Sequence, residues 1–308
     1  MLLALGLVLA LAALLLVVVP IALLRRHAAT APPPPQPHTT EAEALLLSRP
    51  FVLVHAHADD EVMFFLPTLQ LLRARLPPAL YAQSLVVCMT SNPLLRATEY
   101  GACAAQLLGL APSQVRVVHC PEPSTTTTTS TEAASAAAET TTTLVTVGAE
   151  TGLWDGFAHR YAAEVVADTL VRVLPRGFDW RGANFVTFDA HGVSGHPNHI
   201  DVARGVRHAC AVHGGTVFAL DSVPCAVKYV PALYALRFAL LASSSSSSSR
   251  SANSSDTRTS VVAVCSATAR HTLLHALRHV YRSQLVWYRC CFAVLSMYAY
   301  CNTLRIVQ

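Results

Sequence analysis

Charge is scarce in this sequence: only 13% of its 308 residues are charged. Lysine and arginine number 22 against 18 aspartates and glutamates, which leaves a formal net charge of +4. So small an excess creates no strong basic field, which argues against nucleic acid as a partner. The low charge and the 53% of hydrophobic residues also exclude a disordered, collagen-like or coiled-coil chain, because each of these needs a different composition.

Paired cysteine motifs and internal repeats are lacking as well. The nine cysteines are scattered, none of them in Cys-x-x-Cys spacing, and only Cys290 and Cys291 are adjacent. An odd number of cysteines without a framework is typical of reduced thiols. We therefore expect a cytosolic environment.

What the sequence does have is a long apolar run over residues 2–24. As a helix this run spans about 34 Å, enough to cross a hydrocarbon core of ~30 Å. A cleaved signal peptide is the alternative, with Ala-Thr-Ala at 29–31 as a cleavage-like sequence, but no basic region precedes the run. Because Arg25 and Arg26 follow it, the positive-inside rule places the rest of the chain in the cytosol. We predict a transmembrane anchor over residues 1–26.

Composition divides the remaining chain. Residues 27–48 form a predicted linker, since four consecutive prolines within it favour polyproline II over helix or sheet. The predicted domain covers residues 49–308. Two low-complexity inserts, at 124–143 and 243–256, interrupt it and have too little apolar surface to offset the entropy of ordering them.

Short β-branched runs alternate with helical stretches in this domain. The expected strands are 51–56, 84–89, 115–119, 184–189, 216–220 and, as the last one, 260–265; the expected helices are 61–75, 96–108, 158–174 and 199–213. Continuous apolar strands that alternate with helices predict an α/β, Rossmann-like fold, in which a mainly parallel sheet has helices on both faces.

A first cluster of polar residues follows the strand at 51–56, and reads His-Ala-His-Ala-Asp-Asp-Glu over residues 55–61. Ligands of such folds bind outside the carboxyl ends of the strands. A single acid here would be explained by capping of the next helix. Three adjacent acids repel one another, and a bound cation relieves this repulsion most simply. We interpret the cluster as part of a metal site, with capping alone as the alternative.

A second cluster follows the strand at 184–189 and ends in Gly-His-Pro-Asn-His at 195–199. Gly192 and Gly195 permit a tight turn, and Pro197 suits the first turn of a helix. His196 and His199 are three residues apart, so both can face the same direction. Either histidine alone is more often a helix-end or core residue. Together, and at the same sheet edge as the acids, they favour a metal site.

Histidine and carboxylate ligands without a thiolate suit Zn²⁺ in a catalytic site with three protein ligands and an open position for water. The same ligands also suit Fe²⁺. Zinc is favoured for hydrolysis, because it lowers the pKa of bound water to about 7. We therefore predict Zn²⁺ or another divalent metal, with a carboxylate outside the ligand set as general base.

The two clusters together resemble the LmbE-like/PIG-L de-N-acetylases, whose first motif is written AHPDDE and whose second contains a GHxxH-type loop. The likeness is greatest to the eukaryotic members that act on N-acetylglucosaminylphosphatidylinositol. It extends from about residue 50 to residue 307 outside the inserts, and includes LDSV at 220–223, KY at 228–229, YRSQ at 281–284 and WYR at 287–289.

The resemblance implies a role for each residue of the site. His57, Asp60 and His199 would be the metal ligands, and Asp59 the general base. His196 would stabilise the tetrahedral intermediate or protonate the leaving amine. The implied reaction is hydrolysis of the acetamide of N-acetylglucosaminylphosphatidylinositol to glucosaminylphosphatidylinositol and acetate, the second step of glycosylphosphatidylinositol anchor synthesis. The implied place is the cytosolic face of the endoplasmic reticulum membrane, with the glycolipid and the membrane as partners.

Two positions depart from the family pattern. Ala58 stands where the motif has proline, and residues 90–96 are shorter than the glycine-containing loop of the relatives. Arg96 and Glu99 keep the family's spacing. We predict that Arg96 contacts the polar part of the substrate, with an ordinary surface arginine as the alternative.

Residues 285–300 are apolar and rich in aromatics. We expect them at the membrane interface, because Trp and Tyr favour the headgroup region, with a buried terminal helix as the alternative. Two other functions stay open at this point. One is deacetylation of a soluble N-acetylglucosamine conjugate, and the other is an inactive, membrane-tethered protein that binds a glycolipid.

Overall fold

The computed structural model describes residues 40–90, 94–121, 143–230, 233, 260–264 and 267–307. The predicted membrane anchor at 1–26 lies outside this part of the chain, as do residues 124–142 and 243–256 of the predicted inserts. Among the helices of the described part, none is both long and apolar enough to span a membrane.

An eight-stranded sheet forms the centre of the described residues, in the order β4-β3-β2-β1-β5-β6-β8-β7. The pairs from β4 to β6 are parallel, whereas β8 runs antiparallel to β6 and β7. This confirms the predicted mainly parallel α/β sheet. The strands are β1 (Phe51–His57), β2 (Leu85–Thr90), β3 (Val115–His119), β4 (Thr143–Thr146), β5 (Asn184–Phe188), β6 (Thr216–Leu220), β7 (Ser260–Val264) and β8 (Cys301–Val307).

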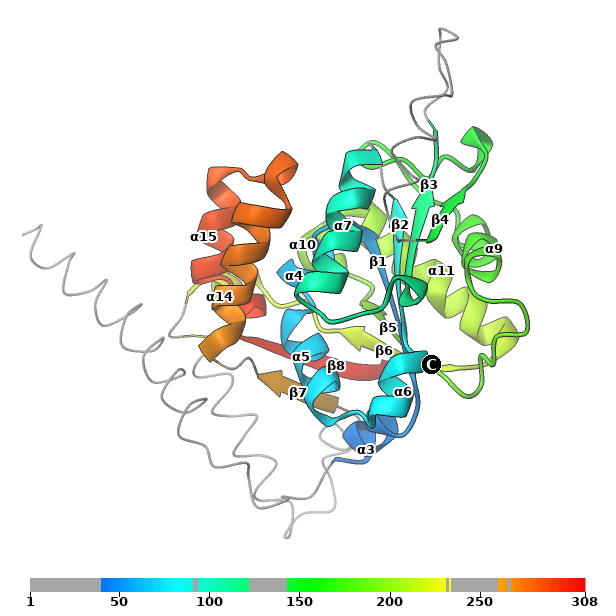
Figure 1. Cartoon of the computed structure of the whole chain (residues 1–308), viewed down its shortest axis with the longest axis horizontal. Helices are drawn as coiled ribbons and strands as arrows, with labels where there is room; N and C mark the ends of the chain where they lie inside the picture. Colours follow the sequence, from blue (N-terminus) through cyan, green and yellow to red (C-terminus); the bar gives the residue numbers. More distant parts are fainter. Residues whose placement is uncertain are drawn as a thin grey trace, which may run out of the picture.

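Helices lie on both sides of this sheet (Figure 1), with α5 and α7 on one side and α9 and α11 on the other. Right-handed crossovers produce this arrangement when the chain winds outward in two directions. The helices are α3 (Glu41–Leu47), α4 (Asp60–Met63), α5 (Leu66–Arg75), α6 (Pro78–Gln83), α7 (Leu94–Gln106), α9 (Ala163–Val173), α10 (Gly192–Gly195), α11 (Pro197–His213), α12 (Cys225–Tyr229), α14 (Ala267–His275) and α15 (Trp287–Leu295). Shorter helical turns are η2 (Pro112–Gln114), η3 (Ala149–Thr151), η4 (Ala276–Val280), η5 (Arg282–Gln284) and η6 (Met297–Ala299).

The winding direction changes between β1 and β5, which are neighbours in the middle of the sheet. From β1 the chain continues to β2 and β3 on one side, and from β5 to β6 on the other. In doubly wound folds, ligands bind at this switch point, outside the carboxyl ends of the strands. His57 is the last residue of β1, and the second cluster follows β5 directly. The topology therefore brings both predicted clusters to one place.

The C-terminal part of the sheet differs from the sequence prediction. The strand at 260–264 is not the last one, because β8 follows it and inserts between β6 and β7. β8 escaped prediction because Asn302 and Arg305 interrupt its apolar pattern. Both find partners: Asn302 Nδ2 donates to the Phe64 carbonyl at 2.8 Å, and Arg305 Nε donates to Asp221 at 2.8 Å.

Two helical predictions also need correction. The helix expected over 61–75 is split into α4 and α5, because Pro67 lacks an N–H and fits only the first turn of α5.

The predicted linker at 27–48 contains α3, whose Ala42 and Leu46 are fully buried against the domain. Asn184 Nδ2 holds the end of α3 by donating to the Leu45 carbonyl at 2.8 Å. The folded unit thus includes residues 40–48.

Candidate metal centre

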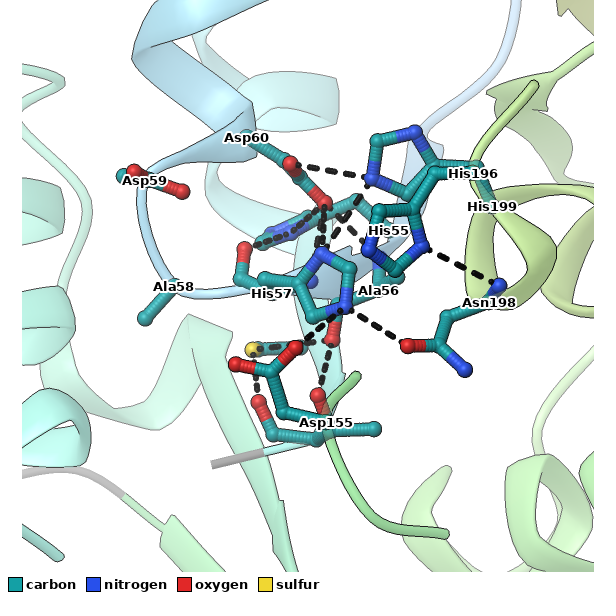
Figure 2. Close-up of polar contacts among 12 residues, drawn as sticks. His55, Ala56, His57, Ala58, Asp59, Asp60, Asp155, His196, Asn198 and His199 are labelled. Carbon is teal, nitrogen blue, oxygen red and sulfur yellow. Dashed lines mark hydrogen bonds and ion pairs between the residues drawn. The ribbon is translucent and has the colours of Figure 1, made fainter. Parts of the chain in front are cut away.

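Four of the predicted site residues converge at the switch point, as Figure 2 shows. His57 ends β1, and Asp60 opens α4 directly after it. His196 caps the N-terminus of α11 and His199 lies in its first turn. In the described part of the chain, His57, His196 and His199 form a group whose ligand atoms all lie within 4.8 Å of one another.

Three of these side chains have the spacing of a coordination site. Nδ1 of His57 lies 3.2 Å from Nε2 of His199. The Asp60 carboxylate places Oδ1 at 3.3 Å from the same His199 nitrogen and Oδ2 at 3.6 Å from His57 Nδ1. Ligand atoms that surround a zinc ion tetrahedrally at 2.0–2.1 Å are about 3.3 Å apart. The separations therefore fit a small divalent cation.

Hydrogen bonds on the far sides of the rings assign the tautomers. His199 Nδ1 lies 3.1 Å from the Gly192 carbonyl, to which it can only donate. His57 Nε2 faces two acceptor oxygens, of Asn198 and Asp155, each at 3.1 Å. When both rings are neutral, as metal ligands must be, the lone pairs of His57 Nδ1 and His199 Nε2 are therefore directed toward each other. Two facing lone pairs beside a carboxylate are a donor set that fits a cation, with outer hydrogen bonds of the kind that orient metal-ligating histidines.

The charges around His57 also favour a bound cation. Burial alone would lower the pKa of His57, but the carboxylates of Asp155 and Asp60 outweigh it and raise that pKa to about 10. The pKa of Asp60 is held well below its usual range, because its two histidine neighbours outweigh the effect of burial. Backbone N–H groups of Ala56 and His57 also donate to Asp60 Oδ2, at 3.1 and 2.8 Å. The centre is therefore negative enough to attract a cation, which would replace protons there.

A strained turn sets the position of His199. Gly192 has φ 58°, and a Cβ on it would lie 2.9 Å from the Cβ of His199. The next residue, Val193, also has a positive φ, 63°, which is costly for a β-branched side chain. Ser222 Oγ accepts from the Val193 N–H at 2.7 Å, and Lys228 Nζ donates to its carbonyl at 2.6 Å. The LDSV and KY motifs thus hold the loop that carries the histidines.

His196 lies on the open side of the centre. Its ring centroid is 4.7 Å from that of His57 and 4.9 Å from that of His199. The Asn198 N–H donates to His196 Nδ1 at 3.2 Å, so a neutral His196 carries its proton on Nε2. Burial and then the two neighbouring histidines lower the pKa of His196 to about 4. The ring is therefore a neutral N–H donor beside the predicted ligands.

Asp59 is buried but stands apart from the converging ligands. Its backbone is left-handed, with φ 106°, and its carboxylate forms an ion pair with Arg289 of α15. Burial raises the pKa of Asp59, and although Arg289 lowers it, the result is about 7. Asp59 thus lies next to a predicted ligand in the chain, and its role as general base stays a prediction.

The C-terminal motif holds the acidic loop in place. Gln284 Nε2 donates to the Ala58 carbonyl at 3.0 Å, and Arg289 in turn donates to Gln284 Oε1 at 3.0 Å. The Tyr281 hydroxyl donates to Glu61, whose pKa burial raises to about 8. Ala58, which replaces the motif's proline, is thus fixed by a contact from a segment more than two hundred residues away. Both motifs are recognisable in the sequence, but the sequence alone predicts no role for Arg289.

Asp155 is a site residue that sequence reasoning missed. It lies in the loop after η3 and accepts from Arg96 as well as from His57 Nε2. Burial would raise its pKa, but the hydrogen bond from His57 and the charge of Arg96 lower it. Arg96, predicted to contact substrate, is directed at Asp155 here, and its contact with substrate stays a prediction. No motif surrounds Asp155, so only the fold could reveal it.

Replacing Asp155 by Asn should weaken metal binding about 10- to 100-fold, because it removes the negative charge behind His57. The measurement is competition of the full-length protein with a fluorescent zinc chelator. Glu164→Gln, an exposed change on α9, is the control and should leave the affinity unchanged. Equal affinities of Asp155→Asn and the control would show that Asp155 does not orient His57.

Comparison with known proteins adds independent information. Residues 52–210 match the PIG-L family, described as GlcNAc-PI de-N-acetylase. A Schizosaccharomyces pombe protein, named as a probable N-acetylglucosaminyl-phosphatidylinositol de-N-acetylase, is 25% identical over 268 residues, which cover 87% of this chain and 90% of the relative. A solved deacetylase triple mutant involved in the teicoplanin biosynthetic pathway has a TM-score of 0.41 and 17% identity, and covers 84% of this chain and 98% of its own.

The family match includes both halves of the centre and just over half of the chain. The protein is thus an α/β protein of the deacetylase class, with a histidine-rich cluster that could bind a metal. It belongs to the PIG-L family, which confirms the resemblance seen in the sequence.

Proposed function

We propose that this protein is a zinc-dependent de-N-acetylase that hydrolyses the acetamide of N-acetylglucosaminylphosphatidylinositol. The products are glucosaminylphosphatidylinositol and acetate, and the reaction is the second step of glycosylphosphatidylinositol anchor synthesis. The observation that carries the proposal is the convergence of His57 and Asp60 with His199, some 140 positions later, in a member of this deacetylase family. The relative from Schizosaccharomyces pombe supports the substrate by its name.

The residues of the centre divide the work of amide hydrolysis. His57, Asp60 and His199 would hold the divalent ion, which when bound supplies a Lewis acid for the acetamide carbonyl and lowers the pKa of water. Asp59 accepts a proton from the attacking water as the new C–O bond forms. His196 presents its Nε2–H to the oxyanion, and the proton that Asp59 has accepted passes to the leaving amine as the C–N bond breaks. Arg289 keeps Asp59 oriented.

We further propose that the enzyme works at the endoplasmic reticulum membrane. Residues 1–26 would form a single membrane span, and the domain would face the cytosol. The apolar run at 2–24 and the arginines that follow it support this topology. Glycosylation acceptor sites inserted before residue 2 and after residue 307 test it: only the first should be glycosylated, and modification of the second would reverse the orientation.

The substrate is tested with the purified full-length protein in detergent. It is offered the glycolipid and, in parallel, soluble N-acetylglucosaminyl-inositol, and release of acetate is measured for both. We expect the glycolipid to be preferred at least about tenfold in kcat/KM, because binding energy from the lipid can be used in the transition state. Preference for the soluble glycoside would establish the alternative of a soluble conjugate. If the metal-loaded protein hydrolyses neither substrate, the alternative of an inactive binding protein would be established.

A further inference from the structure

An exposed apolar tip stands at the junction of η5 and α15. Four consecutive residues, Leu285, Val286, Trp287 and Tyr288, expose 42%, 37%, 79% and 56% of their surface. Later residues of the same segment turn inward: Met297 and Tyr298 are buried, and the Tyr298 hydroxyl donates to the Asp221 carbonyl at 3.0 Å. The predicted interfacial segment 285–300 is therefore two parts, of which only the first faces outward. Contiguous exposed apolar groups of this kind mark interaction surfaces.

The C-terminal segment that carries the tip has charges of one sign. No aspartate or glutamate follows Asp256 in the sequence, whereas six arginines do. Two of them, Arg278 and Arg282, are exposed on the turns that lead to the tip. Arg289, just behind it, is turned inward to Asp59. The tip thus combines apolar side chains with basic groups, and its own segment of the chain contains no acidic residue.

A cavity lies beside the tip and reaches Phe64, a neighbour of His199. It has a volume of about 340 Å³ and is lined by residues that include Phe64, Lys228, Tyr229, Tyr288 and Phe292. Tyr288 belongs to the tip, and the ring of Phe64 lies 5.6 Å from that of His199. In Figure 1, α15 and α14 form the flank of the molecule opposite α9. The mainly apolar cavity therefore lies between the tip and a ring that contacts His199.

We propose that this tip, residues 285–288 with Arg278 and Arg282, docks on the surface of an anionic lipid bilayer. Trp and Tyr side chains prefer the boundary between headgroups and hydrocarbon, and arginines beside them are attracted to anionic headgroups. The cavity would then open toward the layer that holds the lipid. Only this last step, delivery of a lipid substrate to the centre, rests on the proposed function; docking itself does not require catalysis.

The experiment measures contact of Trp287 with lipid in the full-length protein. The protein is reconstituted in phosphatidylcholine vesicles that contain phosphatidylserine, with and without brominated chains, which quench tryptophan on contact. The sequence holds three tryptophans, of which Trp154 and Trp180 are partly buried within the domain. We expect brominated lipid to quench the wild type at least about twofold more than Trp287→Phe.

A moved reporter gives the matched control. Val212 on α11 is 66% exposed, and α11 lies on the other side of the sheet from α5 and α7. Val212→Trp combined with Trp287→Phe should show no more quenching than Trp287→Phe alone. Equal quenching of the wild type and Trp287→Phe, or strong quenching of the moved reporter, would overturn the proposal.

The basic groups are tested separately with Arg278→Gln combined with Arg282→Gln. In the wild type, vesicles with phosphatidylserine should quench more than neutral vesicles, and this variant should lose the difference. If the variant keeps the difference, the two arginines do not belong to the docking surface. The wild type is also examined in detergent at rising protein concentration. A blue shift of Trp287 emission there would assign the tip to a second copy of the chain instead of a bilayer. Because none of these readouts needs turnover, an inactive protein would still test docking.

Discussion

Replacing Asp59 by Asn is expected to lower turnover of the glycolipid about 10²- to 10⁴-fold while the metal content stays unchanged. The carboxylate that accepts the proton is lost, whereas His57, Asp60 and His199 keep their places. The Asp59 carboxylate is not among the potential ligand atoms that lie close together at the centre. KM should change little, because the carboxylate is assigned no contact that holds the sugar before reaction.

Asparagine is the right replacement because of the backbone. Asp59 has φ 106°, a region in which Asp and Asn are tolerated far better than alanine. Asn therefore removes the charge without forcing the loop to move. It does leave Arg289 without its carboxylate partner, so Arg289→Gln is made in parallel. Arg289→Gln should cost less than Asp59→Asn, since it disturbs the orientation of the base and leaves the base present.

The measurement combines steady-state kinetics with metal analysis of the same preparation. Asp168→Asn, a change of the same kind at an exposed position of α9, is the control and should behave like the wild type. If Asp59→Asn were to lose its metal, Asp59 would be a ligand and the general base would have to be sought elsewhere. Full activity of the variant would remove Asp59 from the mechanism.

Much of the fold could be predicted from the sequence because its central strands are continuous apolar runs. The expected strands at 115–119 and 216–220 agree in full with β3 and β6. β8 could not be predicted, because Asn302 and Arg305 need partners from distant segments before they can lie in a sheet. The break between α4 and α5 was predictable from Pro67, which fits only the first turn of a helix.

The centre was predictable to the extent that its residues lie in two short motifs. His57 ends β1 and Asp60 follows it closely, while His196 and His199 lie in the segment that follows β5, so the topology brings both motifs to one sheet edge. Asp155 and Arg289 show the opposite case. Asp155 lies in no recognised motif, and the motif that contains Arg289 gives no role for it; the contact of each with the centre depends on how a loop and a C-terminal helix fold back. Periodicity and spacing carry no information about such contacts.

Replacing His199 by Ala is expected to remove the metal as well as the activity. His199 Nε2 lies 3.2 Å from His57 Nδ1 and 3.3 Å from the Asp60 carboxylate. Without it, two ligands are left, too few for the three-ligand arrangement that zinc enzymes use. Metal content measured by mass spectrometry should fall to a small fraction of one ion per chain, and acetate release should fall to background.

Loss of packing could imitate loss of a ligand, so a second substitution is needed. The His199 ring stacks on Phe188, with centroids 4.1 Å apart and planes 4° from parallel. His199→Gln keeps more of this contact than alanine does, and it should also lose the metal. His208→Ala, at an exposed position on the same helix, controls for damage to α11. Thermal unfolding of each variant shows whether the domain is still folded.

His196→Ala completes the series, because it separates the two histidines of the GHxxH-type loop. The His196 ring lies among the potential ligands, yet its Nδ1 is engaged by the Asn198 N–H. With His57, Asp60 and His199 as the ligand set, His196→Ala should keep its metal and lose most of its turnover. Retention of metal by His199→Ala together with its loss from His196→Ala would exchange the two roles, and would make His57 and His196 with Asp60 the coordinating group.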